Sequence, residues 1–515
     1  MIDATPFLRA YARRREAALA GQDPIAAQRA TLRALVRQAA ATRFGREHGF
    51  PAIATPAAFQ AQVPVRTYED FWARYWQEPF PVLEDETWPG RMPFFALSSG
   101  TTTGRTKYIP VSRAMVAANR RAALDILVHH LANRPGSRVL GGKSFMLGGS
   151  TALDRLAPGV RGGDLSGIAA ATVPFYARSR TFPPASLALE ENWERKIARL
   201  APASLAEDIR AISGTPTWLM AFFETLARMH PARGERLDAF YPKLELVVHG
   251  GVAFGPYAAR VDRLIAGSAI RTQEVYPASE GFFAIQDRGR GDGLRLIVDN
   301  GIFYEFVVPE TLGTRAPRRA WLEDAEIGVD YALVVSTNAG LWAYEVGDLV
   351  RLVSKDPPRV VFAGRTAFTL SAFGEHLTGA EIDRAVDAAA REIGAELVEI
   401  GAGARHRAEG AAQDHHLFVV ELAEGAPSPA RARALRAALD RALVRANADY
   451  AAHRDAGQLA APELVCAPRG TFASWMRARG KLGGQNKPPR VITDAALLAT
   501  LERAAAQGTR VPAGR

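Results

Sequence analysis

The chain has 515 residues, of which 48% are hydrophobic and 23% are charged, and its formal net charge is +10. This length is too great for one ordinary core, so two or more domains are expected, and the composition excludes a disordered chain. The single cysteine, Cys466, excludes an internal disulfide and a cysteine-rich zinc site, and it fits the reducing cytoplasm.

The first residues lack the apolar core of an export signal, and no apolar run is long enough to cross a bilayer. The basic residues are scattered among Ala, Glu and Asp along expected helix faces rather than gathered in one block with aromatic residues. A cytoplasmic monomer is therefore expected, with no membrane or nucleic-acid partner and with small molecules as its substrates.

Amphipathic helix is predicted over residues 1–48, with an interruption near residues 21–24. Residues 113–131 and 186–230 predict further helices. The segment between them, residues 133–183, is rich in Gly, Pro and Ser and predicts loops around a substrate region.

The centre of the chain is predicted to be rich in strands. Residues 244–249 form a short apolar run that ends in Gly250 and Gly251. Residues 294–308 alternate and turn at an Asp-Asn-Gly sequence, which predicts a hairpin. Further strands are expected at residues 331–336, 349–353 and 360–362.

After residue 365 the expected elements are, in order, a helix (378–393), two strands (396–400 and 416–422), a helix (429–448) and a loop-rich tail. The predicted fold is α/β, with a large N-terminal α/β domain that contains a β-rich subdomain and a smaller C-terminal α+β domain. The boundary is placed at 366, which gives domains of residues 1–366 and 367–515.

Residues 98–107 carry hydroxyls, two glycines and two cations directly after an apolar run. Glycines let backbone N–H groups converge on an anion, and hydroxyls and cations complete a phosphate-binding loop. The spacing is not that of a Walker A loop and suits instead the pyrophosphate end of ATP in an enzyme that activates a carboxylate. The alternative is a solvated linker.

Only seven of the 64 basic residues are lysines, and Lys107 and Lys487 lie in segments marked by Gly or Pro. Lysine suits a point contact to a phosphate or carboxylate oxygen, although seven lysines must fall somewhere by chance.

Three other segments carry groups suited to a nucleotide. Residues 276–281 combine an aromatic ring, a hydroxyl and a carboxylate, and Asp348 and Arg365 stand at strand ends. Alone, Glu280 reads as a surface carboxylate and Asp348 as a turn residue, so the joint presence of these segments carries the interpretation.

Together these segments resemble the GH3 family of acyl-acid amido synthetases, within the adenylate-forming superfamily. The resemblance rests on residues 42–45, 98–110, 276–280, 344–348, 374–375 and 485–490. It therefore covers nearly the whole chain. Glu345 stands where the family's third motif often has arginine, and Ala278 where the second often has serine, so the shape of the acyl site is left open.

The resemblance implies ATP and Mg²⁺ as cofactors and a set of site residues. Lys107, Glu280 and Lys487 are implied to be catalytic, with Glu280 holding Mg²⁺ and Lys487 carried by a mobile C-terminal lid that hinges near residues 366–368. The implied ATP and AMP contacts are Ser98, Ser99, Gly100, Thr101, Thr102, Gly250, Gly251, Tyr276, Ser279, Asp348 and Arg365.

The activity implied is ligation: a carboxylic acid is adenylated, and its acyl group then passes to an amine, expected to be an amino acid. An acyl-CoA ligase that shares the first step, and an inactive nucleotide-binding homologue, remain as alternatives. A hydrolase lacks support because the sequence has no Gly-x-Ser-x-Gly elbow and its histidines have no evident nucleophile; His249 is interpreted as a satisfied strand-end histidine.

Overall fold

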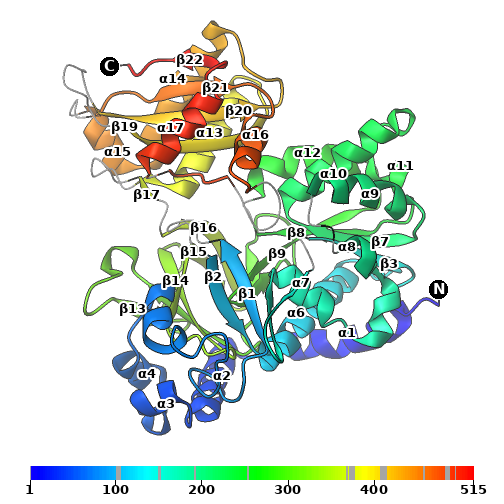
Figure 1. Ribbon diagram of the computed structural model, residues 1–515, viewed down its shortest axis with the longest axis vertical. Coiled ribbons are helices and arrows are strands. Elements are labelled where there is room, and N and C mark those ends of the chain that lie inside the picture. The colour runs from blue at the N-terminus through cyan, green and yellow to red at the C-terminus, as the bar shows by residue number, and fades with distance from the viewer. Residues whose placement is uncertain are drawn as a thin grey trace. The chain divides into compact units, whose positions relative to one another are not determined.

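The computed structural model describes residues 2–99, 106–148, 152–188, 190, 193–251, 254–366, 369–370, 377–405, 414–455, 459–481, 488–492 and 494–514. The chain divides into two compact units (Figure 1). The first comprises Met1–Val346 and Val350–Phe362, and the second comprises Gly347–Leu349 and Ala363–Arg515.

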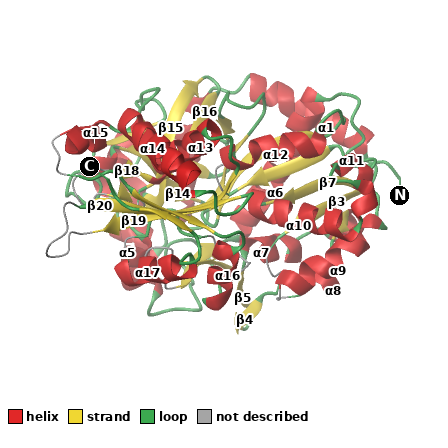
Figure 2. Cartoon of the chain, turned by 90° about the horizontal axis from the view of Figure 1, so that it is seen from above, coloured by secondary structure: helices red, strands yellow, loops and turns green. Residues whose placement is uncertain are grey.

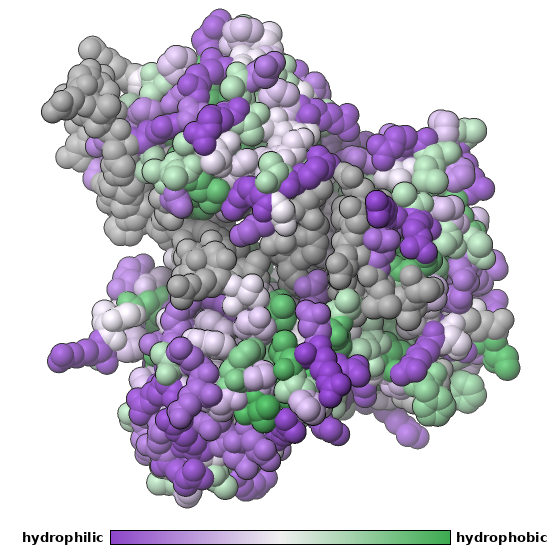
Figure 3. Space-filling view, in the orientation of Figure 1, coloured by the Kyte–Doolittle hydropathy of each residue, from purple (hydrophilic) through white to green (hydrophobic). Residues whose placement is uncertain are grey.

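Helices open the first unit, and four of those described begin at a side-chain cap. They are α1 (Thr5–Ala20), α2 (Pro24–Ala39), α3 (Arg43–Glu47), η1 (Phe50–Ala52), α4 (Pro56–Gln62), α5 (Tyr68–Phe71) and η2 (Trp72–Trp76). The break predicted near residues 21–24 is confirmed, because Asp23 accepts hydrogen bonds from the first backbone N–H groups of α2. Hydrophilic side chains dominate the visible face of α3 and α4 in Figure 3.

A four-stranded sheet follows, in the order β2-β1-β5-β4. Its strands are β1 (Phe94–Ser99), β2 (Thr106–Val111), β4 (Asp154–Ala157) and β5 (Val160–Gly163). The long helix α6 (Arg113–Asn133) begins directly after β2, where the Ser112 hydroxyl accepts a hydrogen bond from the Met115 backbone N–H.

The main sheet has twelve strands. In spatial order they are β13 (Arg319–Trp321), β12 (Ile302–Val307), β14 (Asp330–Thr337), β15 (Tyr344–Lys355), β16 (Pro358–Arg365), β11 (Leu294–Leu296), β10 (Gly281–Ile285), β9 (Arg271–Ala278), β8 (Leu246–Gly250), β7 (Ile209–Gly214), β3 (Lys143–Leu147) and β6 (Thr181–Phe182). Strands β6, β3, β7, β8 and β9 are parallel to one another, and β10 runs antiparallel to β9.

Helices cover both faces of the parallel strands, as Figures 1 and 2 show. One face carries α8 (Ala185–Ala188), α9 (Trp193–Leu205), α10 (Pro216–Met229), α11 (Leu237–Phe240) and α12 (Gly255–Ile265), and the other carries α1 and α6. Helix α7 (Leu165–Ala171) contacts β1 and β5 of the four-stranded sheet. Because side chains alternate along a strand, Val247 of β8 packs in the core beneath α9, α10 and α12, while Leu246 and Val248 pack in the core with α1 and α6.

The second unit is an α+β fold with a sheet in the order β19-β20-β21-β22 and a separate β17-β18 pair. Its elements are β17 (Thr369–Leu370), β18 (Leu377–Thr378), α13 (Gly379–Glu392), β19 (Leu397–Arg405), β20 (His415–Leu422), α14 (Pro429–Ala446), α15 (Ala448–Asp455), β21 (Glu463–Ala467), α16 (Thr471–Ala478), α17 (Ala495–Ala504) and β22 (Thr509–Val511).

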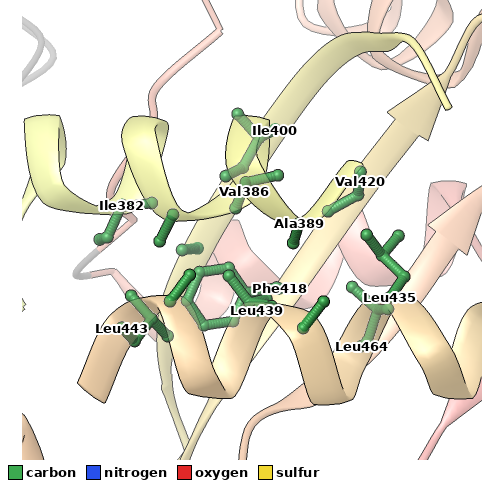
Figure 4. Close-up of a cluster of buried hydrophobic side chains, with 14 of the residues drawn as sticks. Ile382, Val386, Ala389, Ile400, Phe418, Val420, Leu435, Leu439, Leu443 and Leu464 are labelled. Atoms are coloured by element: carbon green, nitrogen blue, oxygen red, sulfur yellow. The ribbon is translucent and has the colours of Figure 1, made fainter. Parts of the chain in front are cut away.

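The core of this unit lies on both sides of its sheet. Figure 4 shows Val386 of α13 and Leu439 of α14 closing on Phe418 of β20. The alternate residue Val419 packs on the other face with α16 and α17. This unit therefore has a hydrophobic core of its own.

Most predicted elements are confirmed, and the exceptions fall within residues 133–230 and 294–308. Residues 294–308 form two strands but no hairpin, since β11 pairs with β10 and β16, whereas β12 pairs with β13 and β14. Residues 133–183 contain strands and the helix α7 rather than loops alone, and the tail after residue 448 carries β21, α16, α17 and β22 between its loops. The helix-rich stretch 186–230 also contains strand β7.

Candidate functional site

The site begins at the hairpin of β1 and β2. The apolar residues Phe95 and Ala96 of β1 are buried. Ser98, near the end of this strand, pairs in register with Lys107 of β2. A strand, not a helix, follows the segment 100–105, as expected for a loop that is not of the Walker A type. The predictions for Gly100, Thr101 and Thr102 lie outside the described residues, and for Ser99 only the backbone is described.

Lys107 is held by two residues of α5 that the sequence analysis missed. Its side chain is 24% exposed, its Nζ lies 3.7 Å from Glu69 Oε1, and it stands 5.2 Å above the ring of Tyr68. The Tyr68 hydroxyl accepts a hydrogen bond of 3.0 Å from the Tyr108 backbone N–H. Burial raises the pKa of Tyr68 to about 12, so this hydroxyl stays protonated.

A second part of the site is the tip of the β9–β10 hairpin. Ala278 pairs with Gly281, so Ser279 and Glu280 form the two-residue turn between the strands. The hydroxyl of the buried Tyr344 donates a hydrogen bond of 3.4 Å to Glu280 Oε1. The pKa of Tyr344 lies well above its usual value because the ring is buried and because the carboxylates of Glu280 and Glu69 face it.

Backbone pairing brings these parts together. The Arg66 backbone N–H donates to Ala343 O over 3.0 Å, and the Glu345 N–H donates to Arg66 O over 2.9 Å. The segment that leads into Tyr68 and Glu69 is thereby fixed beside Tyr344. Four segments distant in sequence thus place Lys107, Glu69, Tyr344 and Glu280 in one cluster.

Gly250 is the last residue of β8, and Gly251 follows it. Glycine is favoured at the two positions for different physical reasons. A Cβ at Gly250 would lie 2.1 Å from Val275 O on the neighbouring strand, so no side chain fits there. Gly251 has φ +80°, a left-handed conformation that glycine adopts without strain.

Tyr276 lies in β9, one strand away from the glycine pair in the sheet order. It is buried, and its ring makes edge-to-face contacts with Phe283 at 5.1 Å and with Phe362 at 6.3 Å. The ring is therefore fixed in orientation by aromatic packing.

Asp348 and Arg365 lie together in the second unit, as their expected cooperation requires. Arg365 Nε is 2.8 Å from Asp348 Oδ1, and the aspartate side chain is 6% exposed while the arginine is 43% exposed. The Thr366 backbone N–H donates to Gly347 O over 3.0 Å and holds the two chain segments side by side. Asp348 lies within β15 rather than in a turn before a strand.

The expected C-terminal lysine loop is described only at its end. Lys487 lies outside the described residues, as do residues 374–375. Arg490 is described, and it pairs with Asp383 at 3.1 Å and with Glu399.

His249 is not the satisfied histidine that the sequence suggested. It lies next to the last residue of β8 and is 2% exposed, but among the described residues neither ring nitrogen has a hydrogen-bond partner. The imidazole stacks on Phe254 at 3.7 Å. Burial, with a smaller contribution from Arg290, lowers its pKa to about 3, so it is neutral at physiological pH.

Phe222 and Phe223 lie with Phe254 in the hydrophobic core beneath the main sheet. His130 contacts a hydroxyl, because its Nε2 lies 3.0 Å from Ser137 Oγ. Both residues are buried, and burial lowers the pKa of His130 to about 4. So weak a base suits a structural contact better than the activation of the Ser137 hydroxyl as a nucleophile.

Among the described residues there is no group of three or more His, Cys, Asp or Glu side chains that could hold a metal ion. A metal at Glu280 would therefore need oxygen ligands from a phosphate and water, which is the usual coordination of Mg²⁺. In the part of the chain that the structure describes, no helix has both the length and the hydropathy of a membrane span.

Three family models match the chain. They are the GH3 family N-terminal domain over residues 13–154, the GH3 family central domain over residues 295–365 and the GH3 family C-terminal domain over residues 380–496.

Similar curated proteins include the jasmonoyl–L-amino acid synthetase JAR4 of Nicotiana attenuata, 28% identical over 38% of this chain and 34% of that protein. The indole-3-acetic acid-amido synthetase GH3.10 of Arabidopsis thaliana is 30% identical over 34% of this chain and 30% of that protein. The matches thus span about a third of these relatives. A putative indole-3-acetic acid-amido synthetase, GH3.10 of Oryza sativa subsp. japonica, is 27% identical over 67% of this chain and 79% of that protein.

Among solved structures, a GH3.15 acyl acid amido synthetase matches with a TM-score of 0.76 at 19% identity, over 95% of this chain and 94% of that chain. A 2-hydroxyisobutyryl-CoA ligase in complex with 2-HIB-AMP matches with a TM-score of 0.60 at 18% identity, over 93% and 92%. The expected architecture, with a large N-terminal and a smaller C-terminal domain, is confirmed.

Proposed function

The chain belongs to the GH3 family, and on that premise we propose that it is an ATP-dependent acyl-acid amido synthetase. A carboxylate oxygen attacks the α-phosphorus of ATP, which forms the acyl–adenylate bond and releases pyrophosphate. An amine, in our proposal that of an amino acid, then attacks the acyl carbon, forms the amide and releases AMP.

The cluster of Lys107, Glu69, Tyr344 and Glu280 is the observation that carries this proposal. It joins a cation beside a Ser/Thr/Gly-rich loop to a carboxylate at a hairpin tip. A polyphosphate chain needs charge neutralisation along its length, and a lysine with a metal-binding carboxylate supplies it. The carboxylate substrate is already a nucleophile, so positioning and charge neutralisation are the main tasks of the protein.

We assign the nucleotide contacts within this frame. Ser98 to Thr102 and Lys107 would hold the phosphates, and Ser279 would contact the α-phosphate. Gly250 and Gly251, at the end of β8, would line the adenine near Tyr276 of the neighbouring strand β9. Asp348 would accept hydrogen bonds from the ribose hydroxyls, with Arg365 fixing its carboxylate.

Glu280 would hold Mg²⁺ through a carboxylate oriented by the Tyr344 hydroxyl. When bound, the ion would neutralise phosphate charge.

The second unit would act as a lid that carries Lys487. We expect Lys487→Ala to slow adenylation roughly a hundredfold, because about 3 kcal/mol of charge stabilisation is lost. ATP–pyrophosphate exchange measures this step. Lys481→Ala removes a nearby lysine without an assigned role and is the matched control. Exchange at the wild-type rate in Lys487→Ala would show that its assigned role is wrong.

The decisive experiment separates the amide ligase from its two alternatives. Carboxylic acids are first screened by pyrophosphate exchange, and AMP release is then measured with the best acid and either amino acids or CoA. Release on adding an amino acid supports the proposal, and release only with CoA identifies an acyl-CoA ligase. No exchange with any acid, but calorimetric heat on adding Mg·ATP, identifies an inactive nucleotide-binding homologue. Neither exchange nor heat would show that the chain does not bind the nucleotide and would overturn the proposal.

The proposal includes a cytoplasmic monomer that acts on small molecules. The one cysteine, Cys466, is buried, and burial raises the pKa of its thiol to about 12, so it is unreactive at neutral pH. Sedimentation velocity of the purified chain tests the monomer, and fractionation of the producing cells tests the location.

A further inference from the structure

A cavity of about 610 Å³ in the first unit is lined by four arginines and, among the residues that the structure describes, by no acidic side chain. Arg113 and Arg120 come from α6, and Arg155 and Arg161 come from the β4–β5 hairpin. The other lining residues are apolar or small, such as Val116 and Thr172. The cavity has the size of an ordinary small-molecule site.

The two hairpin arginines oppose each other directly. Arg155 of β4 pairs in register with Arg161 of β5, and both are exposed. Like charges directly opposite one another on neighbouring strands destabilise a sheet, so this arrangement has a cost in the absence of a ligand. An anion bound between the two guanidinium groups would remove that cost.

Helix α6 adds two further cations from one face. Arg113 and Arg120 are two turns apart, with Val116 between them, and all three line the cavity. Arg113 lies in the first turn of this helix, where the helix dipole adds to the positive potential. Arg120 donates a hydrogen bond to the Thr172 backbone oxygen, which directs its guanidinium toward the wall formed by residues 171 and 172.

No carboxylate of the described residues forms an ion pair with any of these four arginines. This contrasts with the buried arginines of the same unit, where Arg319 pairs with Glu305 at 2.8 Å and Arg359 pairs with Asp287. Guanidinium groups match phosphate and carboxylate oxygens with two parallel hydrogen bonds. Four of them around one cavity favour a ligand with several negative charges.

The cavity is distinct from the proposed nucleotide site. Phe94, at the start of β1, lines it, whereas Ser98 and Ser99, at the end of β1, lead into the phosphate loop. Five residue steps along a strand separate the two ends of β1, which is about 16 Å.

We propose that this cavity is a binding site for a compact polyanion with at least two phosphate or carboxylate groups. The guanidinium groups of Arg155 and Arg161 would clamp the anion from the hairpin, and Arg113 and Arg120 would close on it from α6. The proposal does not depend on the ligase activity.

Isothermal titration calorimetry of the full chain tests the site, with tripolyphosphate as the phosphate probe and citrate as the carboxylate probe, at ionic strength fixed with potassium chloride. We expect Arg155→Ala/Arg161→Ala to lose one binding event or to weaken it at least tenfold. Arg13→Ala/Arg14→Ala removes the same charge from exposed residues of α1 and is the matched control. Heats that differ between the probes identify the preferred chemistry.

Thermal unfolding gives a second readout. Tripolyphosphate should raise the melting temperature of the wild type and of the control variant Arg13→Ala/Arg14→Ala. It should raise that of Arg155→Ala/Arg161→Ala, the pocket variant, by less. Without ligand, the pocket variant should be at least as stable as the wild type, because two opposed charges are removed. If it does not fold, Arg113→Gln/Arg120→Gln takes its place. Equal binding by pocket and control variants, or no binding by the wild type, would overturn the proposal.

Discussion

At the scale of single residues, burial strongly controls the protonation of His249. Its ordinary pKa is 6.5 and its folded value is about 3, so the unfolded chain binds a proton in this pH range and the folded chain does not. The stability that neutral His249 contributes is therefore fully present above pH 6.5 and is lost as the pH falls toward 3. At pH 5 the loss is about 2 kcal/mol.

We expect His249→Phe to reduce this loss, because phenylalanine keeps the stacking on Phe254 and cannot bind a proton. Urea unfolding of the wild type and of His249→Phe at pH 8 and pH 5 measures this loss in the free energy of unfolding. Glu274, the neighbour of His249 on β9, has a pKa raised to about 7 by burial, and it acts in the opposite direction. Because Glu274 is present in both proteins, the difference between variant and wild type isolates His249. Identical pH dependences would contradict the assigned protonation state.

Single residues also mark the limit of what the sequence predicted of the site. Lys107 and Glu280 were identified from their motifs, but Glu69 and Tyr68 were not. Their only local signal is the Thr67–Asp70 capping box, which predicts a helix start and no chemistry. They reach Lys107 because the chain pairs near Arg66 and Tyr344, and pairing between segments so far apart leaves no pattern in a single sequence.

At the scale of the elements, Gly250 fixes how closely β8 and β9 approach. We expect Gly250→Ala to destabilise the protein by about 2–4 kcal/mol, since its Cβ would meet a backbone oxygen that has little room to move. Gly255→Ala, at the start of α12, meets no atom within 4 Å and should be close to neutral. Chemical denaturation of both variants tests this, and equal stabilities would show that the two strands can separate.

The contact between Tyr344 of β15 and the β9–β10 hairpin tip is the second prediction at this scale. Tyr344→Phe removes the donor to Glu280 while keeping the buried ring, so we expect about tenfold slower pyrophosphate exchange and a higher Mg²⁺ requirement. Tyr331→Phe also removes a buried tyrosine hydroxyl, but on β14, and should leave both unchanged. An unaltered Mg²⁺ dependence in Tyr344→Phe would refute the positioning role.

Elements with strong periodicity were predicted well, and pairing between strands was not. The helix at residues 113–131 and the strand that ends in Gly250 are close to α6 and β8. The Asp-Asn-Gly turn at residues 299–301 signalled a hairpin, yet its flanking strands join different neighbours in the main sheet. Long-range sheet contacts overrode that local turn signal.

For the whole molecule, the separate cores predict two unfolding transitions. We expect Leu439→Ala, in the core of the second unit, to lower the smaller transition in differential scanning calorimetry, at a cost of about 2–5 kcal/mol. Phe222→Ala, in the core beneath the main sheet, should lower only the larger one. A single peak that both variants shift equally would mean that the chain unfolds as one unit.

The arginine-lined cavity also affects how the protein should be handled in the laboratory. Phosphate, citrate and sulfate are common buffer and precipitant anions, and each carries the kind of charge that opposed guanidinium groups attract. Activities measured in phosphate need not agree with those measured in Tris or HEPES. The buffer is therefore a variable to be controlled from the first purification onward.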